Sequence, residues 1–228
     1  MNGTTRRWLT AVLCGLLASQ AFADEPAQTV LVRGGRFESV LPPAAGVKQV
    51  SVADFRLDRT QVTNAQFARF VQLHPQWRRD EVAALFADTE YLAHWSSAVE
   101  PGARIRNQPV VRVSWFAASA YCEARGARLP TWYEWEYAAA ASARAPLDLH
   151  EVIWEWVEDF AGMLVAGDNR QQSDPDSLRF CGPGALTMEQ KENYPTLMRI
   201  ALLSSMQARY TGPAMGFRCA TSVRSAVR

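Results

Sequence analysis

The sequence predicts an α+β domain with few regular elements and long loops. Short apolar or alternating stretches at residues 30–37 and 50–57 predict strands. Segments with helical apolar spacing begin after hydroxyl residues, at Thr63, Ser114 and Thr131. After Leu147, clusters of glycine, proline and polar residues predict short strands and irregular loops. No linker or repeat divides these elements, so we expect one domain.

The first elements are predicted to be strands. Residues 30–32 are apolar, Gly34 and Gly35 predict a turn, and a second strand follows near Phe37. Residues 50–57 alternate enough between apolar and polar types to predict one further strand.

The predicted helices have recognisable starting signals. Thr63 and Gln66 have the spacing of a capping box, in which a hydroxyl accepts a free N–H and the amide side chain reaches back. Thr131 and Glu134 repeat that spacing. Pro75 is expected to stop the first helix, because proline lacks the N–H that a helix interior needs.

Composition bounds the class of protein. The chain has 228 residues, of which 48% are hydrophobic, so one domain can bury a sizeable core. The formal net charge of +1 gives no reason to expect a nucleic acid as partner.

The N-terminus has the features of a signal peptide. An arginine pair precedes an apolar run at residues 8–17, and a small-Phe-small cleavage pattern follows at 21–23. Spanning a bilayer takes about 20 apolar residues, so this run is too short. We predict a cleaved signal peptide at 1–23, a mature domain at 24–228, and a soluble periplasmic product without direct membrane insertion. The alternative is an N-terminal core helix.

Several segments resemble, in order, the formylglycine-generating enzyme (sulfatase-modifying factor) family. They are residues 32–37 (VRGGRF), 55–58, 62–67, 109–115, 120–122, 128–131 (RLPT), 134–139 (EWEYAA), 154–156 (WEW) and 216–220 (GFRCA). The resemblance runs over nearly the whole predicted mature chain. It implies the α+β fold of that family, which is related to C-type lectins.

The resemblance implies a disulfide between Cys122 and Cys219, because family members with both cysteines bridge them. The alternative is a pair of buried free thiols. Cys181 would then be left over. It is interpreted as a structural or incidental thiol, and a link between two copies of the chain stays open.

The family's metal-binding patterns are absent from this sequence. Its oxidases hold copper with a Cys-x4-Cys pair before a segment that residues 199–204 (RIALLS) resemble, and the pair's positions fall here on or near Gln190 and Pro195. Another branch holds iron with a His-x3-His-x-Glu run. This chain has three scattered histidines: His74, His94 and His150. We expect neither copper nor iron, which argues against an enzyme of either type.

The resemblance also implies one calcium ion. Its ligands would be the carboxylates of Asp148 and Glu155 and the backbone carbonyls of Glu151 and Ile153. Calcium prefers such hard oxygen ligands in a loop. The alternative is that Glu155 caps local backbone and no ion binds.

Three functions are compatible with these features. The first is an exported, catalytically inactive regulatory module, which resembles the TagR group of periplasmic type VI secretion regulators. That group promotes activation of a membrane Ser/Thr kinase through its periplasmic part. The second is an enzyme with altered chemistry on the same scaffold, similar to the PvdO group of periplasmic oxidases. The third is an accessory factor for a periplasmic metalloenzyme.

We prefer the regulatory module, with the periplasmic part of a kinase or another envelope secretion component as partner. Its partner-binding residues are expected in the insertion at residues 72–106. The exposed candidates are Trp77, Phe86, Tyr91 and Trp95.

Overall fold

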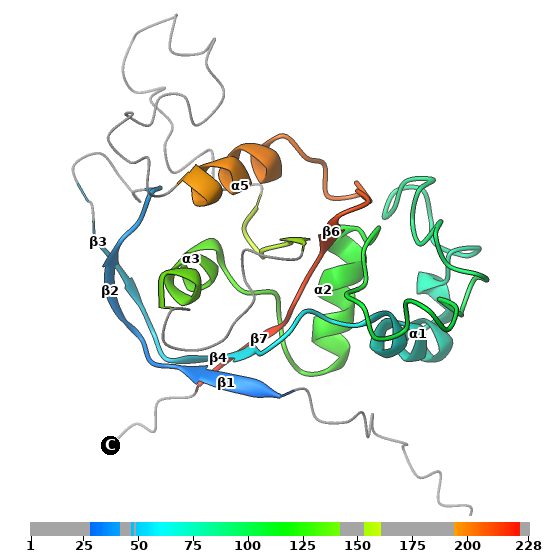
Figure 1. The fold of residues 1–228 in the computed structure, drawn as a ribbon, viewed down its shortest axis with the longest axis horizontal. Helices are drawn as coiled ribbons and strands as arrows, with labels where there is room; N and C mark the ends of the chain where they lie inside the picture. The colour runs from blue at the N-terminus through cyan, green and yellow to red at the C-terminus, as the bar shows by residue number, and fades with distance from the viewer. Residues whose placement is uncertain (1–27, 42–46, 48, 142–152, 161–193, 224–228) are drawn as a thin grey trace, which may run out of the picture.

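The computed structural model describes residues 28–41, 47, 49–141, 153–160 and 194–223 (Figure 1). Its elements, in chain order, are β1 (Thr29–Val32), β2 (Gly35–Glu38), β3 (Gln49–Val52), β4 (Phe55–Asp58), α1 (Asn64–Leu73), the short 3₁₀ helix η1 (Pro75–Trp77), α2 (Trp115–Ala124), α3 (Trp132–Ala141), β5 (Trp154–Glu155), α5 (Tyr194–Ser204), β6 (Met215–Gly216) and β7 (Ala220–Ser222). Short strands and helices alternate with long connections, which confirms the α+β prediction. The predicted signal peptide at 1–23 lies outside the described residues.

The largest sheet joins parts of the chain that are far apart in sequence. It has the strand order β1-β4-β7, and both pairings are antiparallel. Leu57 of β4 lies opposite Val30 on one side and Ala220 on the other. Two further pairs, β2 with β3 and β5 with β6, complete the strands of the described residues. The pairing of β5 with β6 is parallel.

The prediction of one strand at residues 50–57 is wrong, because the chain turns within it. Residues 49–52 form β3, which pairs with β2, and residues 55–58 form β4, which pairs with β1. Asp54 stabilises the turn by accepting hydrogen bonds from the backbone N–H of Gly34 at 2.8 Å and the guanidinium of Arg33 at 2.8 Å. A Cβ on Gly34 would lie 2.2 Å from the carbonyl oxygen of Val52, so this position needs glycine.

The predicted helix starts are confirmed. Thr63 and Gln66 form the complete capping box of α1. Glu134 accepts the backbone N–H of Thr131 at 2.9 Å and donates its own N–H to the Thr131 hydroxyl at 3.2 Å, which is the same motif at α3. The first helix ends at Leu73, just before Pro75.

Helix α5 was not predicted, because only strands and loops were expected after Leu147. Residues Tyr194–Ser204 nevertheless form a helix of 11 residues. Its residues Arg199, Ile200 and Leu203 are buried, at positions that share one helix face. Packing of this face against the rest of the domain therefore accounts for α5.

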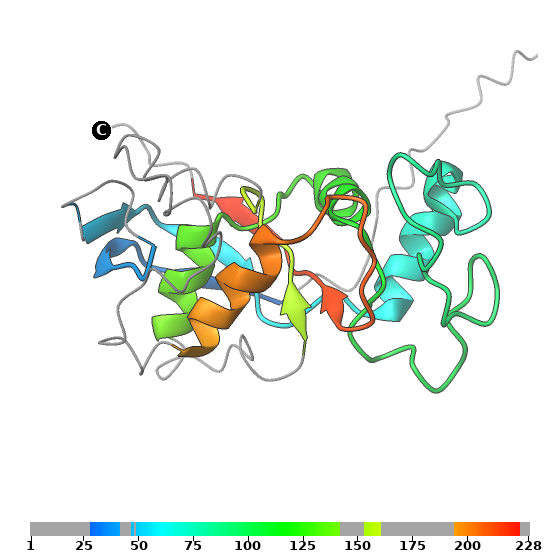
Figure 2. The same cartoon turned by 90° about the horizontal axis from the view of Figure 1, so that it is seen from above.

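The helices lie in layers over the sheet. Figure 1 shows α2 and α3 on one side of the β1-β4-β7 sheet, with α5 beyond α3. Helix α1 and the long connection toward α2 occupy one end of the molecule in both views (Figures 1 and 2). Among the described residues, none of the helices has the length and apolar character required to cross a bilayer.

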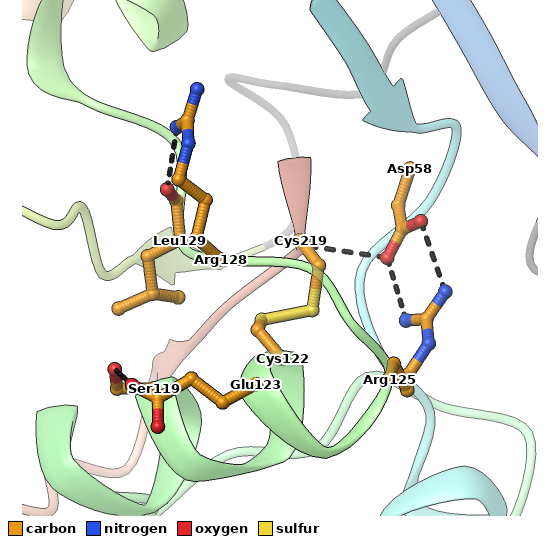
Figure 3. Close-up of a disulfide and its surroundings, with 8 residues drawn as sticks. All are labelled: Asp58, Ser119, Cys122, Glu123, Arg125, Arg128, Leu129 and Cys219. Carbon is orange, nitrogen blue, oxygen red and sulfur yellow. Dashed lines mark hydrogen bonds and ion pairs between the residues drawn. A yellow bond between two sulfur atoms is a disulfide. The ribbon is translucent and has the colours of Figure 1, made fainter. Parts of the chain in front are cut away.

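A disulfide joins Cys122 of α2 to Cys219, directly before β7 (Figure 3). This is the pair that the family resemblance implied. Both cysteines are almost completely buried, at 0% and 1% exposure. Beside the bridge, Asp58 accepts two hydrogen bonds from Arg125, at 2.9 and 3.3 Å, and one from the Cys219 backbone N–H at 3.2 Å. The C-terminal strand is thus attached to both α2 and β4.

Replacing both cysteines, Cys122→Ser with Cys219→Ser, should lower the free energy of unfolding by about 2–5 kcal/mol. The bridge spans 97 residues of sequence, and its loss frees a long loop in the unfolded chain. Urea unfolding followed by tryptophan fluorescence measures the effect. A reductant should destabilise the wild-type protein by a similar amount and leave the double variant unchanged. A double variant as stable as the oxidised wild type would contradict this role.

Candidate functional site

A completely buried carboxylate, that of Glu155 on β5, lies at the centre of the polar groups in the core. Its Oε1 accepts hydrogen bonds from Gln61 at 2.8 Å and from Arg218 at 2.7 and 3.1 Å. Its Oε2 accepts the indole N–H of Trp135 at 3.1 Å and Nε of Arg218 at 2.9 Å. Five donor contacts therefore surround the two oxygens.

Arg218, which is also completely buried, compensates the charge of Glu155. Its Nη1 donates to the carbonyl oxygens of Asp58 and Arg59, at 3.2 and 3.0 Å. Gly216, two residues before Arg218, packs closely against the chain, because a Cβ there would lie 2.3 Å from the backbone oxygen of Val110. The hydrogen bonds and the mutual attraction of the pair offset the cost of removing both charges from water. Removal of one partner would leave the other as an uncompensated buried charge.

A second buried arginine, Arg199 of α5, lies against the same group. Its guanidinium stacks 3.7 Å from the centre of the Trp135 ring, and its Nη2 donates to the backbone carbonyl of Glu155. Burial lowers the pKa of Arg199 to about 9, the charge of Glu155 opposes this change, and Arg218 adds to it. Arg199 thus stays protonated at neutral pH, and α5 is held by a cation–π contact.

Of the two carboxylates expected to bind calcium, the structure describes only Glu155. The hydrogen bonds of Glu155 fit poorly with a role as a calcium ligand. The four donor atoms around Glu155, which make five contacts, all point at the oxygens that calcium would need. Ile153 is half-buried, directly before β5. Asp148 and Glu151 lie outside the described residues, so calcium binding stays a prediction.

The positions expected for a catalytic pair lie near the start of α5. Pro195 is in the first turn of that helix, where proline is well tolerated because its missing N–H has no helical partner. Gln190 and Cys181 lie outside the described residues. Within the described ranges, no three His, Cys, Asp or Glu side chains gather as a metal site.

The two histidines among the described residues, His74 and His94, do not belong to a cluster of metal-binding side chains. His74 caps the end of α1, with its ring 4.8 Å from that of Phe70. His94 is exposed, and its pKa is lowered by partial burial and by the charges of Arg112 and Arg79. His150 lies outside the described residues.

Two of the four expected partner-binding residues are buried, so that prediction is wrong for Tyr91 and Trp95. Their exposures are 1% and 3%. The Tyr91 hydroxyl donates to the Trp77 carbonyl at 3.0 Å, and the Trp95 indole donates to Asn64 Oδ1 at 2.8 Å. Because each polar atom finds an internal partner, burial of these rings costs little. Burial also raises the pKa of Tyr91 above the usual tyrosine value.

The other two candidates, Trp77 and Phe86, lie in a surface that the sequence did not reveal in full. Trp77 is half-buried, Phe86 is 39% exposed, and its neighbour Leu85 is 71% exposed. The Phe86 ring lies 5.8 Å from the ring of Trp77 and 5.3 Å from that of Phe116. We call the set of Trp77, Leu85, Phe86, Trp115 and Phe116 the Leu85 surface.

Phe116 could have been found from helix periodicity. Ala117, Ala118 and Tyr121 form the buried face of α2, so Phe116 must point away from that face. Its ring contacts Trp115 at 5.5 Å, and Trp115 contacts the buried Phe160 at 5.9 Å. A row of aromatic rings thus connects the exposed Leu85 surface with the core.

Residues 16–147 match the sulfatase-modifying factor enzyme 1-like domain, the domain of formylglycine-generating enzymes. The chain belongs to this family. The matched range begins within the predicted signal peptide and ends before β5.

Relatives of this chain include proteins named as active and as inactive enzymes. The inactive C-alpha-formylglycine-generating enzyme 2 of Mus musculus is 34% identical over 149 residues, 51% of this chain and 48% of the relative. The formylglycine-generating enzyme of Streptomyces coelicolor is 34% identical over 164 residues, 53% of this chain and 52% of the relative. The chain thus spans about half the length of these relatives.

A third kind of relative is a kinase. The serine/threonine-protein kinase pkn1 of Chlamydia pneumoniae is 33% identical over 129 residues, 52% of this chain and 20% of the relative. Relatives of these kinds fit a non-catalytic module of the family.

The change Glu155→Gln should lower the free energy of unfolding by about 3–5 kcal/mol, because it leaves Arg218 buried without its counter-charge. Urea unfolding checks this, with Glu158→Gln as a control at an exposed neighbouring carboxylate. Millimolar calcium tests the remaining calcium prediction, because an ion bound through Glu155 would raise the wild-type unfolding midpoint. A clear rise with calcium that Glu155→Gln abolishes would show that Glu155 is a ligand after all.

The change Trp95→Ala should destabilise the fold by about 3–5 kcal/mol, as large truncations in a core do. The change Leu85→Ala should alter stability by less than about 0.5 kcal/mol, because that side chain is mostly exposed. Equilibrium unfolding of the two variants separates a core residue from a surface residue. Equal stabilities would contradict the placement of Trp95.

Proposed function

We propose that this protein is an exported, catalytically inactive regulatory module of the periplasm. It promotes activation of a type VI secretion system by acting on the periplasmic part of a membrane Ser/Thr kinase. The buried centre of the fold serves its structure, and the Leu85 surface provides the contact with a partner.

The observation that carries this proposal is the chemistry at Gln190 and Pro195. The resemblance places the copper thiolates of the family's oxidases at these positions, and neither side chain can supply a soft sulfur ligand. The described part of the chain keeps an ordered scaffold, which includes the Glu155–Arg218 pair and the Cys122–Cys219 disulfide. A retained fold without its reactive groups fits a protein that acts by binding.

The relatives support both halves of the proposal. Two of them, from mouse and cattle, are named as inactive formylglycine-generating enzymes. In the Chlamydia pneumoniae relative, the matched region covers 20% of a much longer chain named as a Ser/Thr kinase. A domain of this family and a kinase are therefore parts of one polypeptide there, which supports a kinase as the partner.

Deletion of the gene should reduce phosphorylation of the membrane kinase and type VI secretion together, and expression of the wild-type chain should restore both. Kinase phosphorylation is measured with a phosphate-binding gel, and secretion by the release of a secreted substrate. The variant Cys181→Ser should restore both functions fully, because regulation by binding needs no thiol.

Two results would overturn the proposal. Unchanged kinase phosphorylation in the deletion strain would exclude the kinase as the target. Failure of Cys181→Ser to restore function, with a stably folded variant of the same oligomeric state as the wild type, would point instead to redox chemistry on this scaffold.

A further inference from the structure

Strand β1 forms one edge of the central sheet. In the strand order β1-β4-β7 it has β4 on one side, and it lies at the margin of the molecule in Figure 1. Among the residues that the structure describes, no backbone hydrogen bond reaches its other side. A row of unpaired N–H and C=O groups of this kind is a template on which another strand can pair.

The pairing of β1 with β4 decides which of its residues have free backbone groups. The N–H of Arg59 donates to the Gln28 carbonyl at 2.8 Å, so these two residues form a hydrogen-bonded pair directly before the strand. Hydrogen-bonded pairs recur at every second residue of an antiparallel ladder. Val30 and Val32 therefore direct their N–H and C=O groups to β4.

The residues between these pairs direct their backbone groups to the free side. By the same alternation, Thr29 and Leu31 point their N–H and C=O groups away from β4. The opposite strand shows the alternation directly. Asp58, which lies opposite Thr29, donates its N–H to Cys219 at 2.9 Å, on the side away from β1. The edge thus offers donors and acceptors from Thr29 and Leu31.

The side chains of β1 do not block a second strand. Its sequence is TVLV, which contains neither a charge nor a proline. Natural edge strands are usually protected by lysine, by proline, by a bulge or by a covering segment. The charged residue that follows β1, Arg33, already forms an ion pair with Asp54 at 2.8 Å. A strand that pairs here should therefore be uncharged and apolar as well.

A second copy of β1 meets these requirements. In an antiparallel pair about a two-fold axis through Leu31, this residue lies opposite itself, and Thr29 lies opposite Arg33 of the second copy. The free groups then meet, because odd-numbered residues face odd-numbered residues. No like charges are brought opposite each other. Val30, which is half-buried in the single copy, comes to lie opposite Val32 of the second copy and is covered further.

We propose that two copies of this chain pair antiparallel through β1. The pairing joins their central sheets into one antiparallel sheet with three strands from each copy, which is an ordinary size for a sheet. The contact is isologous, as in most two-fold dimers. Because it is short, we expect a reversible dimer with a Kd on the order of 10 µM. The inference goes beyond the proposed function and does not rest on it.

The variant Leu31→Cys, in a Cys181→Ser background, tests the register. Residues of a hydrogen-bonded antiparallel pair have Cα atoms about 5.5 Å apart, which a disulfide can bridge. Mild oxidation of the purified full chain should therefore give a dimer, with mass spectrometry showing a bridge between the two copies of residue 31. Thr29→Cys in the same background is the control, because its position lies opposite Arg33 of the second copy. It should give about tenfold less dimer.

No dimer from Leu31→Cys, or equal yields from the two cysteine variants, would overturn the proposed pairing. The same variants in the native envelope test for another occupant of the edge. There Leu31→Cys should again form mainly the dimer. A bridge from residue 31 to a different protein, in place of the dimer, would refute the second copy and assign β1 to an extended segment of that protein.

Analytical ultracentrifugation measures the dimer without a cross-link. Leu31→Lys should weaken dimerisation about tenfold or more, because it places two ammonium groups opposite each other. Gln49→Lys, at an exposed position of β3 opposite Glu38, adds the same charge elsewhere and should leave dimerisation unchanged. Far-UV circular dichroism verifies the fold of both variants, and the cysteine cross-link does not depend on it. A wild-type protein that stays monomeric at about 500 µM, or equal effects of the two lysines, would contradict the proposal.

Discussion

The ion pair between Glu155 and Arg218 is the contact on which the rest of the fold depends. Gln61, Trp135 and Arg199 reach the same carboxylate or its backbone from other parts of the chain. The pair thus fixes the positions of β5, α3, α5 and the segment before β7 relative to one another. Burial of two charges is tolerated here because each finds a full set of partners.

The Glu155–Arg218 pair explains how this sequence can resemble a family of oxidases although it lacks the catalytic cysteine pair of those oxidases. The WEW and GFR motifs supply Glu155 and Arg218, whose contacts with each other build the domain. Motifs of this kind report the fold, whereas chemistry depends on other positions, and the resemblance would place the catalytic pair on or near Gln190 and Pro195. The same contacts explain the poor fit of calcium. The donors to Glu155 come from Gln61, Trp135 and Arg218, so the local sequence around the motif gave no sign of them.

Contacts within one helical turn leave a signal in the local sequence, whereas most contacts between distant segments do not. The cap at Thr63 is formed by residues within one helical turn, so its spacing alone predicts it. Residues 50–57 have the alternation of a single strand, and only their pairing with β1 and β2 divides them into two. Tyr91 and Trp95 were expected at the surface, and partners that are distant in sequence draw them inside. The α+β class, in contrast, followed from the balance of the short elements.

The order of the strands has a consequence for the route by which the chain reaches its folded state. Strand β4 pairs with residues 29–32 on one side and 220–222 on the other. The central sheet therefore cannot form until residues 220–222 have been synthesised, and such long-range pairing is slow. The buried cysteines meet only when β7 arrives, so their oxidation would mark the end of folding.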